Sequence, residues 1–238
     1  MTDTILITGA SRGIGLSIAN ALSARGEQVI GIARNSVNDF PGKLFQADLG
    51  NAEATKACLS SILSDYRVNG VVNNVGLATG QALAKLDLED FINVLDMNAR
   101  VAAQVTSTVV PMMISSGYGR IVNISSVVAL GAPQRTSYAA AKGALISMTR
   151  AWALEFAKDG ITANAVAPGP IETEFFRSLN PQGSAGERRY LAQLPVGRIG
   201  TTHEVASAVS FLLQRDAGFI TGQVLYVDGG LSAGRNVL

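Results

Sequence analysis

A tyrosine and a lysine separated by three alanines are the residues of this 238-residue chain that most directly suggest acid–base chemistry. In Tyr138-Ala-Ala-Ala-Lys142 the two polar side chains stand at i and i+4, on one face of a predicted helix. A free phenol has a pKa near ~10 and is a poor acid or base at neutral pH. Because a neighbouring ammonium favours the phenolate, Lys142 would lower the pKa of Tyr138 and make it a candidate general acid or base. An ordinary surface pair has the same spacing, so further residues are needed.

Two serines and an asparagine supply those residues. Ser125 and Ser126 follow the apolar run 121–124, at the strand end where open α/β sheets bind ligands. A hydroxyl there can donate to a substrate oxygen while Tyr138 transfers its proton, although serines also end strands without further function. Asn98 interrupts a window of helical pattern, which indicates a kink or a bound water.

A glycine-rich turn, Thr-Gly-Ala-Ser-Arg-Gly-Ile-Gly at 8–15, lies between the first predicted strand and the first predicted helix. Small residues let a backbone approach a pyrophosphate, whose charge is met by free N–H groups at a helix N-terminus. No Lys-Ser/Thr pair follows, so the turn is not a P-loop. Tight strand–helix turns also need glycine for packing, so nucleotide binding is predicted from the turn together with its strand–turn–helix context.

The end of the second predicted strand bears on the choice of cofactor. A carboxylate there would bind the ribose 2′-OH of NAD(H), whereas an arginine accommodates the 2′-phosphate of NADP(H). The strand ends at Ala33-Arg34, with no acid before Asp39. Arg12 and Arg34 could meet a phosphate dianion together, and the alternative is that both are simply solvated. The pair favours NADP(H) over NAD(H).

The same turn also matches a rival motif, the G-x-S-x-G nucleophile elbow, with Ser11 as nucleophile and His203, the one histidine, downstream. An elbow on the first strand leaves no earlier loop to supply the second oxyanion N–H group. Residues 201–205 also predict a helix start with threonine as N-cap, which makes His203 a surface residue. A serine α/β-hydrolase using Ser11 and His203 is therefore the weaker alternative.

Short β-branched runs alternate with stretches of helical periodicity along the whole chain. Strands are predicted at 4–8, 29–33, 43–47, 70–73, 120–124, 161–166 and 223–227, and helices at 14–25, 51–64, 87–115, 137–158 and 202–214. This alternation predicts an α/β fold: a single doubly wound, Rossmann-type domain over 1–238, with a seven-stranded parallel sheet flanked by helices.

The stretch from Pro168 to Pro195 breaks that rhythm and is too long for an ordinary connection. We expect a substrate-binding loop at about 172–195. Its apolar side chains could line a substrate wall or simply pack the loop, and its two adjacent arginines could meet an acidic carrier or be solvated: Phe175, Phe176, Leu179, Tyr190, Arg188 and Arg189.

Composition excludes several classes of function. Nineteen Lys and Arg against 18 Asp and Glu leave a net charge of +1, so we expect no nucleic-acid partner and no anionic membrane. Cys58 is the single cysteine, and with one histidine no His/Cys cluster could hold a metal. No apolar run approaches the ~18 residues of a membrane span and no basic leader opens the chain, so a cytoplasmic protein without a signal peptide is expected.

Taken in order, these motifs resemble those of the short-chain dehydrogenase/reductase family over nearly the whole chain. The set comprises the turn at 8–15, Asn73-Asn74-Val75-Gly76, Asn98, Ser126, the Tyr138–Lys142 pair and Pro168-Gly169-Pro170-Ile171. The segment 222–230 is similar to the branch containing the β-ketoacyl-acyl-carrier-protein reductases. Val75 stands where the family has alanine. Ser126 precedes Tyr138 by 12 positions, whereas the family more often has 13, the interval of Ser125; we align Ser126 and keep Ser125 as the alternative.

The resemblance implies an NADP(H)-dependent oxidoreductase that exchanges a hydride between the cofactor and a ketone or secondary alcohol. In the family, Tyr138 would be the general acid/base, Ser126 the donor to the substrate oxygen, Lys142 the partner of Tyr138 and of the nicotinamide ribose, and Asn98 the holder of a relay water. A 3-oxoacyl thioester is one candidate substrate. The alternative is NAD(P)-dependent oxidation of a particular secondary alcohol or sugar.

The resemblance also implies a cofactor site and an assembly. Asp48 and Leu49 would lie by the adenine, Asn74 by the adenosine ribose and Ile171 by the carboxamide. The remaining expected cofactor residues are Gly9, Ser11, Arg12, Gly13, Ile14, Gly15, Arg34, Gly76, Pro168, Gly169 and Thr173. A homotetramer is expected, with the helices at 87–115 and 137–158 at one interface and the C-terminal strand region at another.

Overall fold

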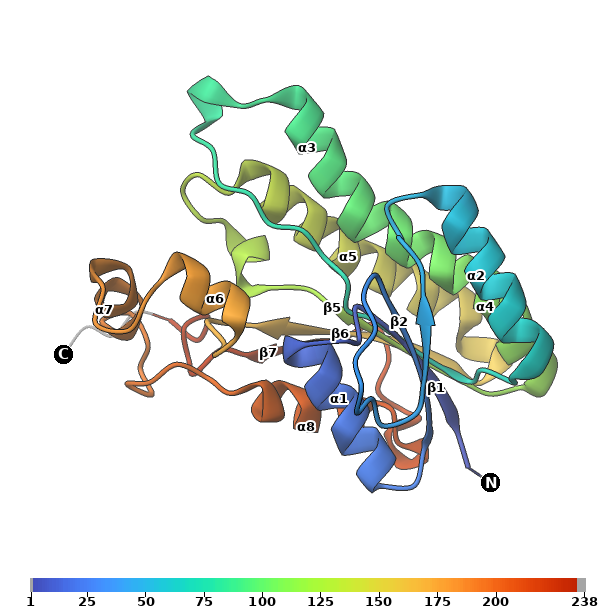
Figure 1. Ribbon diagram of the computed structural model, residues 1–238. Helices are drawn as coiled ribbons and strands as arrows, with labels where there is room; N and C mark the ends of the chain where they lie inside the picture. Colours follow the sequence, from blue (N-terminus) through green and yellow to red (C-terminus); the bar gives the residue numbers. More distant parts are fainter. Residues whose placement is uncertain (1, 235–238) are drawn as a thin grey trace.

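The computed structural model describes residues 2–234 (Figure 1). The predicted domain, 1–238, therefore includes residue 1 and residues 235–238, which lie outside the described residues. The strands form one parallel sheet in the order β3-β2-β1-β4-β5-β6-β7. Their bounds are β1 Thr4–Thr8, β2 Gln28–Ala33, β3 Lys43–Gln46, β4 Gly70–Asn73, β5 Gly119–Ile124, β6 Ile161–Pro168 and β7 Val224–Val227. The predicted seven-stranded Rossmann-type sheet is confirmed.

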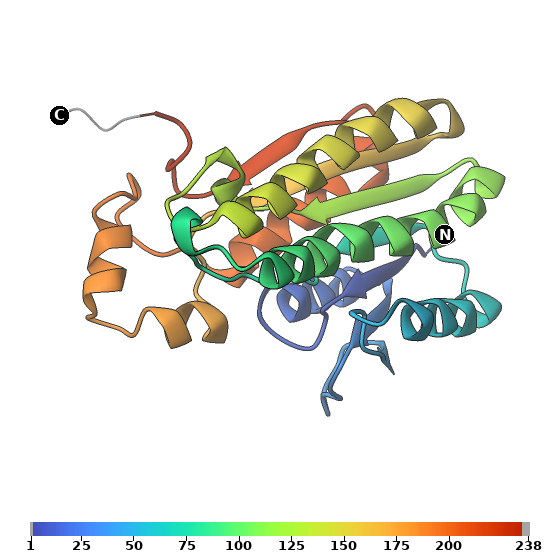
Figure 2. The same cartoon turned by 90° about the horizontal axis from the view of Figure 1, so that it is seen from above.

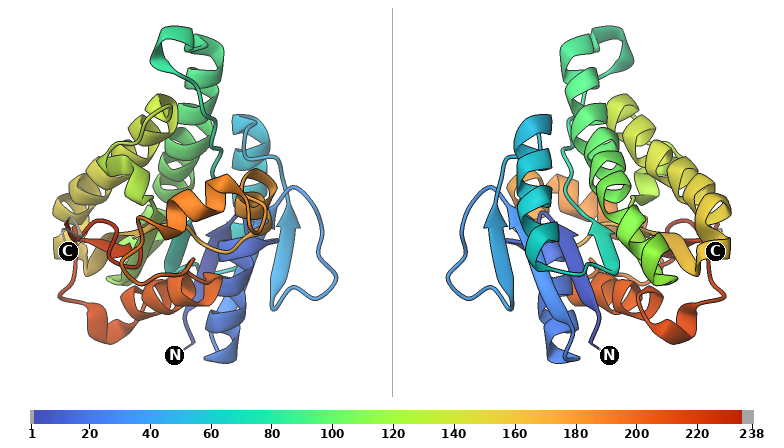
Figure 3. Two further views of the ribbon diagram at one scale, coloured as in Figure 1. Left: turned by 90° about the vertical axis from the view of Figure 1, so that its left-hand side faces the viewer. Right: turned by 90° about the vertical axis from the view of Figure 1, so that its right-hand side faces the viewer.

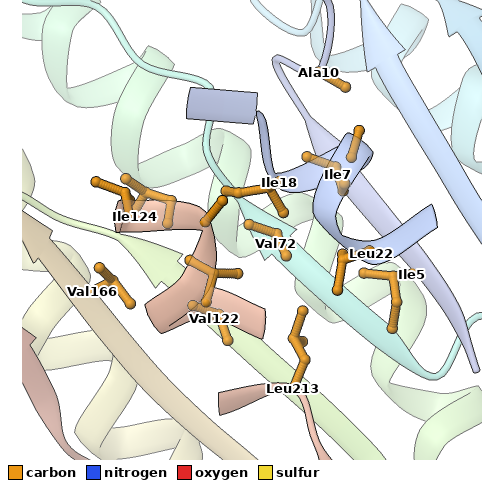
Figure 4. Close-up of a cluster of buried hydrophobic side chains, with 14 of the residues drawn as sticks. Ile5, Ile7, Ala10, Ile18, Leu22, Val72, Val122, Ile124, Val166 and Leu213 are labelled. Atoms are coloured by element: carbon orange, nitrogen blue, oxygen red, sulfur yellow. The ribbon is translucent and has the colours of Figure 1, made fainter. Parts of the chain in front are cut away.

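Helices cover both faces of this sheet, because its central strands are apolar on both sides (Figures 2 and 3). On one face, α1 (Gly13–Ala24) and α8 (Thr202–Leu212) bury their apolar side chains against β1, β4 and β5. Figure 4 shows this cluster, with Ile18 and Leu22 of α1 among the strand residues Ile5, Val72 and Val122. On the other face, α2 (Ala52–Asp65), α4 (Val101–Ser116) and α5 (Thr136–Phe156) complete the second core.

The helix predicted at 87–115 is interrupted, which corrects that prediction. It consists of α3 (Leu88–Leu95), the π-helical turn η2 (Asp96–Arg100) and α4. Asn98 lies in the π-helical turn, and its amide nitrogen donates to the carbonyls of Val94 and Leu77, both at 2.8 Å. The interpretation that Asn98 marks a kink in a helix is thus supported by the structure.

The segment predicted as a loop at 172–195 contains two short helices, which is a second correction. They are α6 (Glu174–Leu179) and α7 (Ala185–Leu191), and Thr173 and Ser184 cap their N-termini. Arg177 forms ion pairs with Glu172 and Glu187 and so ties α6 to α7. Helices of six and seven residues show too little periodicity to be detected in the sequence. Figure 1 places both at the end of the sheet away from the N-terminus.

Single-turn helices complete the chain: Leu83–Lys85, Val127–Leu130, Ala157–Asp159 and Arg215–Ala217. None of the helices within residues 2–234 is both long and apolar enough to cross a membrane.

Candidate active site

The crevice of this fold lies where the strand order reverses, between the carboxyl ends of β1 and β4. The two strand ends are tied together by Thr8 and Asn74. The Thr8 hydroxyl accepts from the backbone N–H groups of Asn74 and Val75 at 3.0 and 3.1 Å. The Asn74 amide donates to the carbonyls of Thr8 and Gly9 at 3.0 and 3.1 Å. The Asn74 side chain, which we expected beside the adenosine ribose, is therefore engaged in bracing the glycine-rich turn.

The glycine-rich turn is tightly packed or backbone-constrained at its glycine positions. A Cβ on Gly15 would lie 2.3 Å from the carbonyl oxygen of Gly9, closer than any real contact. Gly9 and Gly13 have φ of +65° and +55°, a region that favours glycine. Arg12, the N-cap residue of α1, forms no side-chain cap, and no acid occupies the first turn of the helix. The N-terminal N–H groups of α1 are thus left for an anion, and these residues fit a pyrophosphate.

The remaining expected cofactor residues differ in how far they are buried. Arg12 and Arg34 are exposed, and neither forms an ion pair within residues 2–234. Leu49 is buried while Asp48 is exposed, and Arg100 fixes their loop by donating to the carbonyls of Leu49 and Gly50 at 3.0 and 3.1 Å. Ser11 and Ile14 are partly buried, and Ile14 packs against the core.

The segment that follows β6 folds back onto the same turn. Pro168 ends β6, Gly169 donates its N–H to the carbonyl of Val227 at 3.0 Å, and Ile171 is buried. The methyl carbon of Thr173 lies 3.6 Å from the position that a Cβ on Gly13 would take. Residues 168–173 and the glycine-rich turn thus border one crevice.

Lys142 is the most deeply buried ionisable group on the catalytic side of the crevice. Its side chain is on α5, its ammonium donates to the carbonyl of Ile124 at 2.8 Å, and it lies 5.6 Å from the centre of the Tyr138 ring. Burial lowers the pKa of Lys142 to about 7. Lys142 is therefore partly neutral at neutral pH, which the sequence did not predict.

Burial raises the pKa of Tyr138, and the hydrogen bond with Ser126 and the positive charge of Arg135 oppose that rise. This is the reverse of the direction expected from Lys142 alone, because desolvation of the phenolate outweighs the nearby positive charge. Arg135 is a residue that the sequence analysis missed. Only its position three residues before Tyr138, near the start of a helix, could have drawn attention to it.

The two candidate serines point to different partners. Ser125 is buried and donates to the carbonyl of Lys142 at 2.8 Å. Ser126 accepts from the N–H of Val128 at 3.2 Å, and its hydroxyl lowers the pKa of the Tyr138 phenol against the rise that burial causes. Of the two, Ser126 is therefore the hydroxyl that acts on the Tyr138 phenol, while Ser125 is engaged by the backbone of α5.

Gly76 lies between Asn98 and Lys142. A Cβ on Gly76 would lie 2.6 Å from Asn98 Oδ1 and 3.2 Å from Lys142 Nζ. Asn98 Oδ1 is buried and has no hydrogen-bond partner within residues 2–234, so it is an acceptor with unused capacity aimed at this spot. Buried polar groups are rarely left unpaired, so the position fits a water or a hydroxyl that donates to Asn98.

His203 does not join this site. It is exposed in the first turn of α8, where Thr201 and Glu204 form a capping box, as the sequence predicted for Thr201. The part of the chain that the structure describes holds no group of three or more His, Cys, Asp or Glu side chains able to bind a metal.

Comparisons with known proteins agree with this geometry. Residues 9–232 match the family described as enoyl-(acyl carrier protein) reductase, within the short-chain dehydrogenases. The chain is 37% identical over 236 residues to the 3-oxoacyl-[acyl-carrier-protein] reductase FabG of Escherichia coli (strain K12), covering 95% of this chain and 96% of that protein.

The chain belongs to the short-chain dehydrogenase/reductase family.

Solved structures of this family have the same fold. ElxO with NADP bound superposes with a TM-score of 0.92 at 30% identity, covering 98% of this chain and 100% of ElxO. The ligand-free aldohexose dehydrogenase of Thermoplasma acidophilum has a TM-score of 0.92 at 32% identity, covering 100% of this chain and 96% of that one. As a short-chain dehydrogenase/reductase the chain is an oxidoreductase, and the serine hydrolase alternative is not supported.

Proposed function

We propose that the enzyme reduces a ketone to a secondary alcohol with NADPH, and catalyses the reverse oxidation with NADP⁺. The observation that carries the proposal is the cluster at the carboxyl end of β5. There Ser126 follows the strand, and the buried ammonium of Lys142 lies 5.6 Å from the centre of the Tyr138 ring, on the same helix face. When bound, NADPH supplies the hydride.

The catalytic roles follow from the donors in this cluster. Ser126 and Tyr138 would both donate to the carbonyl oxygen of the substrate, which stabilises negative charge as it develops on that oxygen. The O–H bond of Tyr138 then breaks as its proton passes to the alkoxide oxygen, leaving a phenolate. In oxidation the phenolate accepts the proton of the alcohol.

Lys142 and Asn98 would return a proton to Tyr138. With a pKa of about 7, Lys142 can both hold and release a proton near neutral pH. Asn98 Oδ1, buried and unpaired within the described residues, would hold a water on the path between Lys142 and solvent. Gly76 keeps that path open, because any larger residue would fill it.

The cofactor proposal rests on the turn and on two arginines. The pyrophosphate would lie on the N–H groups of α1 beside Gly9, Gly13 and Gly15, with Ile171 and Thr173 on the nicotinamide side. Arg12 and Arg34 are exposed cations available for a 2′-phosphate, which favours NADP(H) over NAD(H). ElxO, a neighbour of 30% identity, binds NADP.

The substrate is proposed at the level of class. The 3-oxoacyl-carrier-protein reductase of Escherichia coli supports a 3-oxoacyl thioester, and the aldohexose dehydrogenase supports a sugar as the second candidate. Phe176 and Tyr190 pack on each other with ring centres 5.5 Å apart, while Phe175 and Leu179 are exposed. The exposed pair on α6 is therefore the better candidate for a substrate wall.

The testing experiment follows NADPH consumption with acetoacetyl thioesters, cyclic ketones and keto sugars, and repeats each assay with NADH. We expect turnover of at least one ketone, and faster turnover with NADPH than with NADH. A protein that binds NADPH but reduces none of these carbonyls, and oxidises none of the matching alcohols, would contradict the proposal.

The assembly and location are proposed on the family resemblance alone: a cytoplasmic homotetramer. Light scattering should give a mass about four times the 24.8 kDa of one chain. A single-chain mass at assay concentration would contradict the tetramer.

A further inference from the structure

Arg135 is a cation in the active site to which neither proton transfer nor cofactor binding assigns a task. It occupies the N-cap position of α5, three residues before Tyr138, and its charge acts on the Tyr138 phenol. Its side chain is partly buried. Arg135 thus stands about one helical turn before Tyr138, on the side of the helix from which a substrate at the phenol can be reached.

Two segments hold the guanidinium in place. It donates from Nη1 to the carbonyl of Thr79 at 3.1 Å, and the Gln81 N–H donates to the carbonyl of Gln134 at 2.9 Å. A Cβ on Gly80 would lie 3.2 Å from Arg135 Nη1 and 3.4 Å from its Cζ, so the guanidinium rests against the glycine backbone. The loop after β4 and the residues before α5 thus form one support for Arg135.

Most of the donors of Arg135 remain unused. Within residues 2–234 it forms no ion pair, and the bond to Thr79 is the single hydrogen bond of its guanidinium, which has five N–H donors. Asp90 is the carboxylate that hydrogen-bonds to the loop supporting Arg135, but it does not pair with Arg135 within the described residues. It accepts from Thr79 Oγ1 at 2.7 Å and from Gln81 Nε2 at 3.3 Å.

The backbone before Arg135 is strained. Gln134 has a φ of +62°, the one positive φ among the non-glycine residues of the described chain. Such strain is usual where a structure fixes a functional side chain. An arginine held by strained backbone, beside the catalytic phenol and without a carboxylate partner, suits an anionic ligand.

We propose that Arg135 binds a carboxylate of the substrate a few bonds from the reacting carbonyl, so that the enzyme acts on oxo acids and the corresponding hydroxy acids. This inference rests on the proposed function, since it assumes that the carbonyl lies at Tyr138 and Ser126. The planar guanidinium fork matches the two oxygens of a carboxylate, and a charge-assisted bond of this kind is stronger than a neutral one. A thioester offers no such charge at that distance.

The test compares acids with their neutral methyl esters. Wild type, Arg135→Leu and Arg135→Lys reduce 3-oxobutanoate, 4-oxopentanoate, 5-oxohexanoate and the three esters with NADPH. For at least one chain length, we expect Arg135→Leu to lower the acid-to-ester ratio of kcat/KM by about 10- to 100-fold. Arg135→Lys should restore part of that ratio, because it keeps the charge and loses the fork.

A binding measurement and a control accompany these rates. Butanoate should inhibit ester reduction competitively, with an inhibition constant about tenfold higher in Arg135→Leu. Arg67→Leu removes an equal charge from an exposed position that forms no side-chain hydrogen bond or ion pair within the described residues, and should leave every ratio unchanged.

The outcomes separate the two proposals. If Arg135→Leu lowers kcat/KM equally for acids and esters, Arg135 positions Tyr138 and the carboxylate site is wrong, while the reductase proposal stands. If wild type prefers esters at every chain length, the site is likewise wrong. If neither acids nor esters are reduced while a thioester, cyclic ketone or keto sugar is, the carboxylate site is again wrong. If none of these carbonyls is reduced although NADPH quenches the fluorescence of Trp152, the proposed function itself fails.

Discussion

The two sides of the crevice are built by opposite means. On the glycine-rich side, Thr8 and Asn74 form hydrogen bonds with each other's backbone and with Gly9, and glycine stands at the positions where a side chain would clash. On the side of Tyr138, and within residues 2–234, Lys142 is buried without an ion-pair partner and Asn98 has an unpaired oxygen. The first side recognises by shape and by free N–H groups. The second side buries polar groups at a cost in folding free energy. Buried groups with shifted pKa values are typical of sites that exchange protons.

The largest effect should come from removing the phenol oxygen. Tyr138→Phe should lower kcat by about 10²- to 10⁴-fold, because the proton donor is lost, while the dissociation constant of NADPH changes little. Steady-state rates and fluorescence titration measure the two quantities. If the Tyr138→Phe enzyme kept its activity, Tyr138 would not be the proton donor. The contrast between the two sides of the crevice would then have to be explained by other groups.

The next effect concerns stability and tests the cost of burying Lys142. Its pKa falls from 10.5 in the unfolded chain to about 7 in the fold, so the unfolded chain binds more protons between these values. Stability therefore rises with pH across this window, and the penalty is fully present below about pH 7. Lys142→Met should be more stable than wild type below pH 7, by roughly 3–5 kcal/mol, with the difference vanishing toward pH 10.5.

Urea unfolding of the protein without cofactor, over this pH range, measures that difference. Lys56→Met changes an exposed lysine and should show no such pH dependence. If the free energy of unfolding of Lys142→Met differed from that of wild type by the same amount at all pH values, the difference would come from packing and not from the burial of a charge.

A smaller effect is expected from the glycine-rich side. Gly15→Ala places a Cβ 2.3 Å from the Gly9 carbonyl, so the turn must shift; we expect a loss of about 1–3 kcal/mol in stability and weaker NADPH binding. Gly143→Ala is the matched control, because its Cβ meets nothing within 4 Å inside α5, and it should be neutral or slightly stabilising. Equal NADPH affinities for the two variants would show that shape does not limit binding here.

The smallest effect should be on the choice of cofactor. Arg34→Ala should lower the ratio of kcat/KM for NADPH over NADH by about 3- to 10-fold, a modest change because Arg34 is exposed and solvent screens its charge. Arg67→Ala serves as control. An unchanged ratio in Arg34→Ala would remove Arg34 from the 2′-phosphate site.

The sequence predicted the sheet well because its strands are β-branched runs buried on both faces, such as Thr4–Thr8 and Gly70–Asn73. The short helices α6 and α7 were missed, since six or seven residues carry little periodic signal. The candidate site residues were chosen from local motifs. What such motifs could not convey is tertiary: the fall in the pKa of Lys142 needs burial, and the place of Arg135 needs contact with Thr79, 56 positions away.

The π-helical turn at 96–100 joins α3 to α4, and it lets the two helices turn different faces toward the protein core. One extra residue in a turn shifts the rotational phase of everything after it, so α3 can pack against α5 while α4 packs against α2, β4 and β5. Deleting one residue there would convert the π-helical turn to regular α-helix and rotate α4 by about a quarter of a revolution relative to α3. The core contacts of α4 and the inward aim of Asn98 could not then both be kept, so the position of Asn98 and the packing of α4 on β4 and β5 depend on the same helical register.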